Sequence, residues 1–360
     1  MSARVLVCCG SGGVGKTTLS AALALKHARA GERVLVVTID PARRLADSLG
    51  VGTLDNTPRA VPLGPGTGSL DAMMLDARAT FDGLVAELAP HPAVARRVLD
   101  NRYYRFAADR LGGVHEYMAM QRLLDLADGP WDTIVLDTPP TRHALDFLRA
   151  PERMAGLFDQ GVLRWIVMPA TAGGWRALEL GSEAIARVLG RLLGRETIGE
   201  IAEFFEAFRE LWEGFRTRSL RVRALLGAPG TRFVLVTAPA PASLDEAFFF
   251  LEQLQARGLP FAGFIVNRVV GAPPPLPAAP PVGGDPSWAA AAAGLAAVRR
   301  ARAAEHEAAI TRLQAAAPAG AACWRVPEQA EAVVALAGLD ALGAHLPGPR
   351  GGGEAAPPAG

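Results

Sequence analysis

Gly-Ser-Gly-Gly-Val-Gly-Lys-Thr, residues 10–17, matches the phosphate-loop pattern G-x-x-x-x-G-K-[ST]. It follows an apolar run at residues 4–9 and leads into a helix pattern. Glycines let the backbone N–H groups face phosphates, and the helix N-terminus adds partial positive charge. We expect Lys16 to reach the β- and γ-phosphates of a nucleotide and the Thr17 hydroxyl to bind Mg²⁺. The predicted nucleotide-binding residues are Gly10, Ser11, Gly12, Gly13, Val14, Gly15, Lys16, Thr17 and Thr18.

Short apolar runs alternate with helix patterns along the chain. The runs that predict strands are residues 4–9, 33–39, 133–136, 232–237, 261–266 and 323–326. Near-continuous apolar strands that alternate with helices indicate a parallel sheet covered on both faces. The predicted fold class is therefore α/β, with a mostly parallel sheet flanked by helices, as in a P-loop nucleoside triphosphatase.

Polar residues follow directly after several of these predicted strands. They include Asp40, Asp137, Thr237 and Asn267. Because ligands bind outside the carboxyl ends of the strands in open parallel sheets, we expect these residues to converge on one crevice. An aspartate at a strand end is more often a turn or cap residue. Beside a phosphate loop, however, Asp137 is a natural carboxylate for the Mg²⁺ shell.

Two stretches without strand signals predict helices inserted into the sheet domain. They span about residues 76–128 and residues 150–228, within a domain that we place at residues 1–346. The apolar stripes of the second stretch, such as Phe204, Phe208 and Phe215, fit the core of a helical subdomain. A groove for an apolar client segment is the alternative. Residues 271–286 form a proline-rich loop, and we expect residues 347–360 to be a disordered tail.

Composition excludes several classes of function. The 360 residues carry a net charge of +1, which gives no electrostatic reason to expect nucleic acid or an anionic membrane as partner. No apolar run approaches the roughly 18 residues of a membrane span, and no secretion signal precedes the first strand. Only three cysteines occur, Cys8, Cys9 and Cys323, all in predicted strands, and the sequence contains no C-x-x-C pair, so we expect neither a disulfide framework nor a zinc or metalloid site. These features favour a cytoplasmic protein.

Four segments together resemble the arsenical-pump and tail-anchored-protein-targeting ATPases, the ArsA-type branch of the deviant Walker A class. They are residues 10–18, 40–42, 137–143 and 266–268. The resemblance covers about residues 1–346, and it implies an ATP- and Mg²⁺-dependent ATPase that works as a dimer. The dimer is expected to form between identical subunits or with a paralogue.

The resemblance also assigns roles to single residues. It implies that Asp40 of the Asp-Pro-Ala segment positions the attacking water. Residues 137–143 would form the switch that couples the γ-phosphate to the helical subdomain. Asn267 would read the edge of the adenine, for which its amide offers a donor and an acceptor. Pro327 would flank the base.

Two residues depart from the family pattern. The signature lysine that reaches a partner's nucleotide is replaced by Ser11, and the usual glycine of the second switch is replaced by Arg142. A serine supplies no positive charge. We therefore expect that the protein hydrolyses ATP slowly as a homodimer or that it pairs with a paralogue that retains the lysine. The alternatives are therefore a nucleotide-gated ATPase with an unidentified client and a regulatory subunit with weak ATPase activity. A partition or septum-positioning ATPase is a third, which the long helical insertion disfavours.

Overall fold

The computed structural model describes residues 3–40, 42–64, 68–102, 104–105, 114–139, 195–275, 288–331, 333 and 335–349, with only the backbone at 114–116 and 195–207. The chain divides into two compact units. The first comprises Met1–Met74, Ala127–Ala144 and Gly227–Gly360, and the second comprises Leu75–Leu126 and Leu145–Leu226. Residues 140–194, 276–287 and 350–360 lie outside the description, and with them much of the predicted second insertion and most of the proline-rich loop and of the predicted tail.

The first unit contains an eight-stranded sheet in the order β3-β4-β2-β5-β1-β6-β7-β8. Its strands pair in parallel, except that β3 at the edge is antiparallel to β4. The strand bounds are β1 Arg4–Gly10, β2 Arg33–Thr38, β3 Arg59–Val61, β4 Ser69–Met74, β5 Thr133–Asp137, β6 Thr231–Thr237, β7 Phe261–Val269 and β8 Ala322–Pro327. The strand order of the centre brings the ends of β2, β5 and β1 side by side, where the phosphate loop begins.

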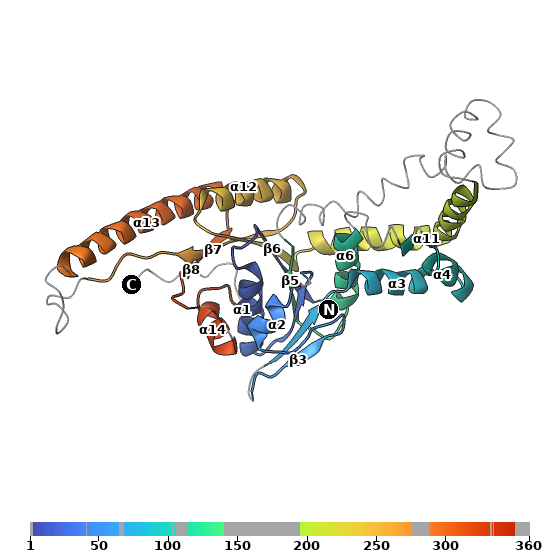
Figure 1. The fold of residues 1–360 in the computed structure, drawn as a ribbon, viewed down its shortest axis with the longest axis horizontal. Coiled ribbons are helices and arrows are strands. Elements are labelled where there is room, and N and C mark those ends of the chain that lie inside the picture. Colours follow the sequence, from blue (N-terminus) through green and yellow to red (C-terminus); the bar gives the residue numbers. More distant parts are fainter. Residues whose placement is uncertain are drawn as a thin grey trace, which may run out of the picture. The chain divides into compact units, whose positions relative to one another are not determined.

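Helices cover the two faces of this sheet (Figure 1). Their bounds are α1 Lys16–Arg29, α2 Arg44–Leu49, α12 Pro241–Ala256, α13 Trp288–Ala316 and α14 Ala335–Gly343. Alternate strand residues such as Val36, Val135 and Val234 pack into one core with α1, α2 and α14. On the other side, α12 packs against β6 and α13 packs against β7 and β8. The arrangement follows from strands whose side chains are apolar in both directions.

The predicted α/β fold is confirmed, and its six predicted strands are present. The sequence prediction missed β3 and β4. The residues of β4 read Ser-Leu-Asp-Ala-Met-Met and contain no β-branched side chain, so they carry little strand signal of their own. Parallel pairing with β2 along six residues supplies the conformation instead.

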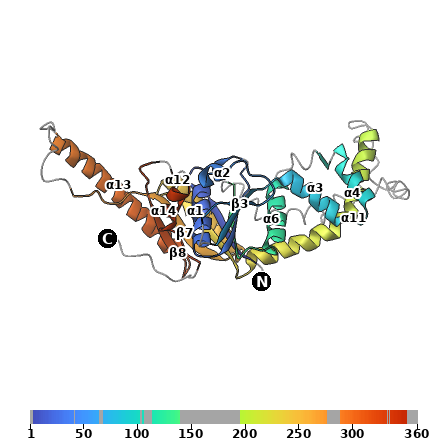
Figure 2. The ribbon, with the colours of Figure 1, turned by 90° about the horizontal axis from the view of Figure 1, so that it is seen from below.

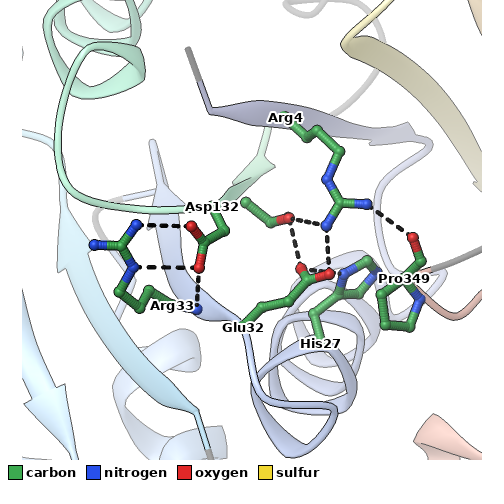
Figure 3. A network of polar contacts seen from close by, with 7 residues as sticks. Arg4, His27, Glu32, Arg33, Asp132 and Pro349 are labelled. Carbon is green, nitrogen blue, oxygen red and sulfur yellow. Dashed lines mark hydrogen bonds and ion pairs between the residues drawn. The ribbon is translucent and has the colours of Figure 1, made fainter. Parts of the chain in front are cut away.

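A polar network ties together the amino ends of the central strands, at the far end of α1 from the phosphate loop (Figure 3). Glu32 accepts hydrogen bonds from Arg4 and Thr133, and its Oε2 lies 3.0 Å from Nδ1 of His27. Arg4 also donates to the carbonyl of Pro349, and the Arg33 guanidinium forms a two-point pair with Asp132. This network joins β1, β2 and β5 to Pro349, the last residue that the structure describes.

The second unit is helical in its described part. Its helices are α3 Ala77–Leu88, α4 Pro92–Leu99, α6 Val114–Ala127 and α11 Arg195–Gly227. In both views α3 runs beside α11 (Figures 1 and 2). The rings of Phe208 and Phe215 stack with their centroids 5.1 Å apart, and the Phe215 ring also meets the Phe81 ring edge-on. The buried Arg218 of α11 binds Glu87 and Asp125.

These described stripe residues form the second unit's own core. Residues 163–168, an apolar part of the predicted second insertion, lie outside the description. In the part of the chain that is described, no helix combines the length and apolar character needed to cross a membrane.

Candidate functional site

The phosphate loop joins β1 to α1, as its sequence predicts. Gly13 and Gly15 adopt φ values of 78° and 88°, a region that glycine enters without steric cost. Gly15 is the N-cap residue of α1, and no side chain caps the helix. The first turn of α1 contains no acidic residue either. Uncapped N–H groups and the positive end of the helix together favour an anion.

The Thr17 hydroxyl and the Asp137 carboxylate meet at the start of α1. Thr17 Oγ1 donates to Asp137 Oδ2 at 2.7 Å. Thr38, at the end of β2, donates to the same oxygen at 2.9 Å. Ser20 Oγ lies 3.5 Å from the second carboxylate oxygen, Oδ1. Hydroxyl and carboxylate oxygens are the ligands that Mg²⁺ prefers, so the oxygens brought together here fit that cation.

Asp137 is fully buried, and its charge has no arginine beside it among these contacts. Burial raises the pKa of this carboxyl, whereas the nearby Lys16 charge and the hydroxyls of Thr17 and Thr38 oppose the rise. Lys16 is itself buried, and its Nζ lies 3.5 Å from the carbonyl oxygen of Gly10. The site thus holds a buried ammonium and a buried carboxylate that neutral groups solvate incompletely.

Asp40 is connected to this centre through Thr38. The backbone N–H of Asp40 donates to Thr38 Oγ1 at 3.2 Å, and Thr38 in turn donates to Asp137. Asp40 Oδ1 accepts from the Ala42 N–H at 2.9 Å, and Oδ2 lies 3.6 Å from Arg44. The two predicted switch segments are therefore linked by hydrogen bonds. The Asp40 side chain is held by its own loop.

The beginning of the predicted second switch lies against β1. Thr138 donates both its N–H and its hydroxyl to the Cys8 carbonyl, at 3.2 and 2.9 Å. These bonds extend the pairing of β5 with β1 by one residue beyond the sheet. The remaining switch residues 140–143, which include Arg142, lie outside the described part of the chain.

Asn267 lies against the phosphate loop. Its Nδ2 donates to the Val14 carbonyl at 2.7 Å, and its Oδ1 accepts from the Arg268 N–H. Pro327 ends β8 opposite Val269 of the neighbouring β7. The strand ends thus bring Asn267 to the loop, whereas Pro327 pairs with the neighbouring strand and its carbonyl accepts from the Gln329 side chain at 2.9 Å.

Ser11 is buried, with 7% of its surface exposed. Its hydroxyl oxygen has no hydrogen-bond partner among the described residues. A buried hydroxyl without a partner is costly, so a ligand group within the loop would satisfy it. At the position where the resemblance predicts a lysine, the loop therefore carries a buried, polar but uncharged side chain.

Sequence reasoning did not single out Thr38 and Ser20 as site residues. Both carried a signal. Thr38 directly precedes the Ile39-Asp40 strand end, and Ser20 lies one helical turn after Lys16 on the same face of α1. Spacing from the phosphate loop would have found Ser20, whereas the contact of Thr38 with Asp137 depends on the pairing of β2 with β5.

Comparisons with known proteins agree with this geometry. Residues 3–275 match the family model described as anion-transporting ATPase. The chain is 29% identical to the ATPase ARSA1 of Chlamydomonas reinhardtii over 297 residues, which cover 74% of this chain and 35% of the algal protein. It is 26% identical to the ATPase get3 of Neurospora crassa, over 72% of this chain and 71% of the fungal protein.

A mycobacterial relative is more similar in sequence. The chain is 36% identical to Protein Rv2184c of Mycobacterium tuberculosis over 278 residues, which cover 74% of this chain and 59% of the relative. The chain thus spans about a third of the algal relative's length and well over half of the other two. Its phosphate loop, strand-end carboxylates and matched region identify it as a member of the anion-transporting ATPase family.

Proposed function

We propose that the protein binds Mg²⁺-ATP at the carboxyl end of its sheet and hydrolyses the β–γ phosphoanhydride bond. The observation that carries this proposal is the 2.7 Å hydrogen bond between Thr17 and Asp137 beside the buried Lys16. Lys16, Thr17 and Asp137 thereby place an ammonium group beside hydroxyl and carboxylate oxygens at the start of a helix that no side chain caps. Phosphoryl transfer needs mainly such positioning and electrostatic stabilisation.

Each residue then has a part in the reaction. The loop N–H groups and Lys16 hold the phosphates, and Lys16 stabilises negative charge that develops on the transferred group. Thr17 and Asp137 would hold the cation, Asp137 either directly or through a water molecule. The cation, when bound, would neutralise charge on the phosphate oxygens. Asp40, next to the site through Thr38, orients the attacking water.

Ser11 leads us to propose slow turnover by the pure protein. Losing a cation that reaches across a dimer to the transferring phosphate can cost on the order of 10³–10⁵ in rate. A nucleotide-gated dimer would then act either as a slow homodimer or with a paralogue that supplies the lysine. The second candidate function, a nucleotide-holding regulatory subunit, is favoured by the same uncharged, buried Ser11.

A metalloid is disfavoured as the client of this ATPase. Metalloids bind clusters of soft thiolates. Burial raises the pKa of the Cys8 and Cys9 thiols to about 12 and that of Cys323 to about 11. These thiols stay protonated at neutral pH. A hydrophobic segment remains the proposed client class, and the cytosol the proposed location.

Steady-state ATPase measurement on the pure protein and on Ser11→Lys tests this proposal. We expect slow, Mg²⁺-dependent turnover that increases in the variant. Native mass measured with ADP and a γ-phosphate mimic tests dimer closure in the same samples. Fast turnover in the wild type with no gain in Ser11→Lys would refute the role given to Ser11. Absence of nucleotide binding would refute the function itself.

A further inference from the structure

We propose that Asn267 is a positioning residue that holds the phosphate loop in its binding shape. Its effect would extend to the phosphates, beyond any contact with the base. This inference rests on the proposed nucleotide function. It assigns to the end of β7 a role in the geometry of a loop that follows β1.

The contact crosses one intervening strand of the sheet. Strand β6 separates β7 from β1, yet Nδ2 of Asn267 lies 2.7 Å from the Val14 carbonyl in the loop after β1. The side chain therefore reaches past the end of β6 to Val14 of the phosphate loop. Backbone pairing does not connect these two segments, so the amide supplies their described hydrogen bond.

The space at Gly15 is matched to this amide. A Cβ built on Gly15 would lie 2.5 Å from Nδ2 of Asn267, far inside van der Waals contact. Gly15 also has φ of 88° and caps α1 directly before Lys16. The loop residue that sets the start of the helix thus lies directly against the Asn267 side chain. Displacement of one would displace the other.

The backbone conformation around Asn267 orients its side-chain amide toward the phosphate loop. Arg268 adopts φ of 59°, which is uncommon for a residue with a Cβ, and its N–H donates to Asn267 Oδ1 at 2.9 Å. The pairing of β7 with β8 shifts register between Val266 and Val269. Bulges of this kind redirect a side chain next to a binding site. The acceptor end of the amide is thereby fixed while its donor end holds the loop.

Two roles for Asn267 make different predictions for a ligand that lacks a base. An amide that only reads adenine affects ATP and leaves inorganic tripolyphosphate unchanged. An amide that holds Val14 and Gly15 in place affects both ligands, because both depend on the loop N–H groups. The ratio of the two affinities therefore separates positioning from base recognition.

The experiment measures binding of Mg²⁺-tripolyphosphate and Mg²⁺-ATP to the full chain by calorimetry. The variants are Asn267→Ala and Asn267→Ser, the latter polar but too short to reach Val14. Gln314→Ala, which removes an exposed amide on α13, is the control. We expect Asn267→Ala to weaken both ligands by a similar factor of about three to ten, the equivalent of one hydrogen bond. The control should bind both as the wild type does.

Hydrogen–deuterium exchange of the loop, without ligand, provides a second measurement. Residues 11–16 should exchange faster in both Asn267 variants than in the wild type. An unchanged tripolyphosphate affinity in Asn267→Ala, or unchanged loop exchange, would overturn the proposal. If the wild type binds neither ligand, the proposed nucleotide function is wrong, and the exchange measurement still decides whether Asn267 holds the loop.

Discussion

Carboxylates at the two ends of α1 have pKa values that are shifted in opposite directions. At its start, Asp137 is fully buried among hydroxyls, and burial raises its pKa. At its far end, Glu32 is also partly buried, but hydrogen bonds from His27, Thr133 and Arg4 outweigh that burial and lower its pKa. The Arg33 pair lowers the pKa of Asp132 to about 2.

This difference separates binding from stability within one helix and its neighbouring strands. A buried carboxylate whose neighbouring lysine and hydroxyls do not offset its burial costs folding free energy and gains from a bound cation. A carboxylate matched by arginine and histidine contributes to folding and has little need of a ligand. We infer that the start of α1 is built for a ligand and that its far end is built to hold the strands. Four substitutions test this contrast.

The largest effect should come from Lys16→Met. Removing one preorganised group that stabilises developing charge costs on the order of 10²–10³ in turnover. Steady-state ATPase rates with saturating Mg²⁺-ATP measure the loss. The matched control is Lys26→Met at the other end of α1, where the ammonium donates to the Leu346 carbonyl. Equal losses in the two variants would contradict the functional division of the helix.

Asp137→Asn should abolish most Mg²⁺-dependent turnover and raise the thermal stability of the ligand-free protein. The amide oxygen can still accept from Thr17 and Thr38, while its N–H₂ faces Ser20. The folded-state pKa of Asp137 is raised above its ordinary value of 3.8. The charged carboxylate therefore costs stability that is absent below pH 3.8 and grows as pH rises through the folded-state pKa.

The advantage of Asp137→Asn should accordingly be larger at neutral pH than near pH 4. Thermal unfolding followed across this range measures it. A variant that is less stable than the wild type at neutral pH would show that the carboxylate is satisfied without a ligand.

Glu32→Ala should destabilise the fold by about 1–3 kcal/mol while turnover stays close to the wild-type rate. The change leaves Arg4, His27 and Thr133 without their shared acceptor. Because the pKa of Glu32 is lowered from 4.5, its contribution is present above pH 4.5 and disappears as pH falls through the folded-state value. Urea unfolding at neutral and acidic pH checks both statements. A large loss of turnover in Glu32→Ala would contradict the assignment of the far end of α1 to stability and not to ligand binding.

Asp132→Asn should have the smallest effect. Its pair with Arg33 lies at the surface, where solvent and salt screen the interaction. The pKa of Asp132 is lowered from 3.8 to about 2, so its contribution to folding stability is present above pH 3.8 and is lost as the pH falls toward 2. We expect a slight drop in the unfolding temperature that vanishes at high salt. A drop as large as that of Glu32→Ala would mean that the pair acts as part of the buried network.

The parts of the site that follow from local sequence were predictable. The spacing of the phosphate loop fixes Lys16 and Thr17 because strand, loop and helix are contiguous. Asp137 was recognised because an apolar strand ends at it. The contact of Asn267 with Val14 was not predicted, since it depends on a bulge in β7 and on strand order. Thr38 and the Glu32 network likewise depend on which strands are neighbours, which no local pattern records.

Calorimetric titration of ATP with Mg²⁺ and with a chelator, on the wild type and Asp137→Asn, tests the central claim most directly. We expect Mg²⁺ to strengthen ATP binding to the wild type, and we expect this gain to be largely lost in the variant, which stays folded. ATP binding that is equally tight with and without Mg²⁺, or a Mg²⁺ gain that Asp137→Asn retains, would contradict the assignment of this sheet end as a Mg²⁺-nucleotide site.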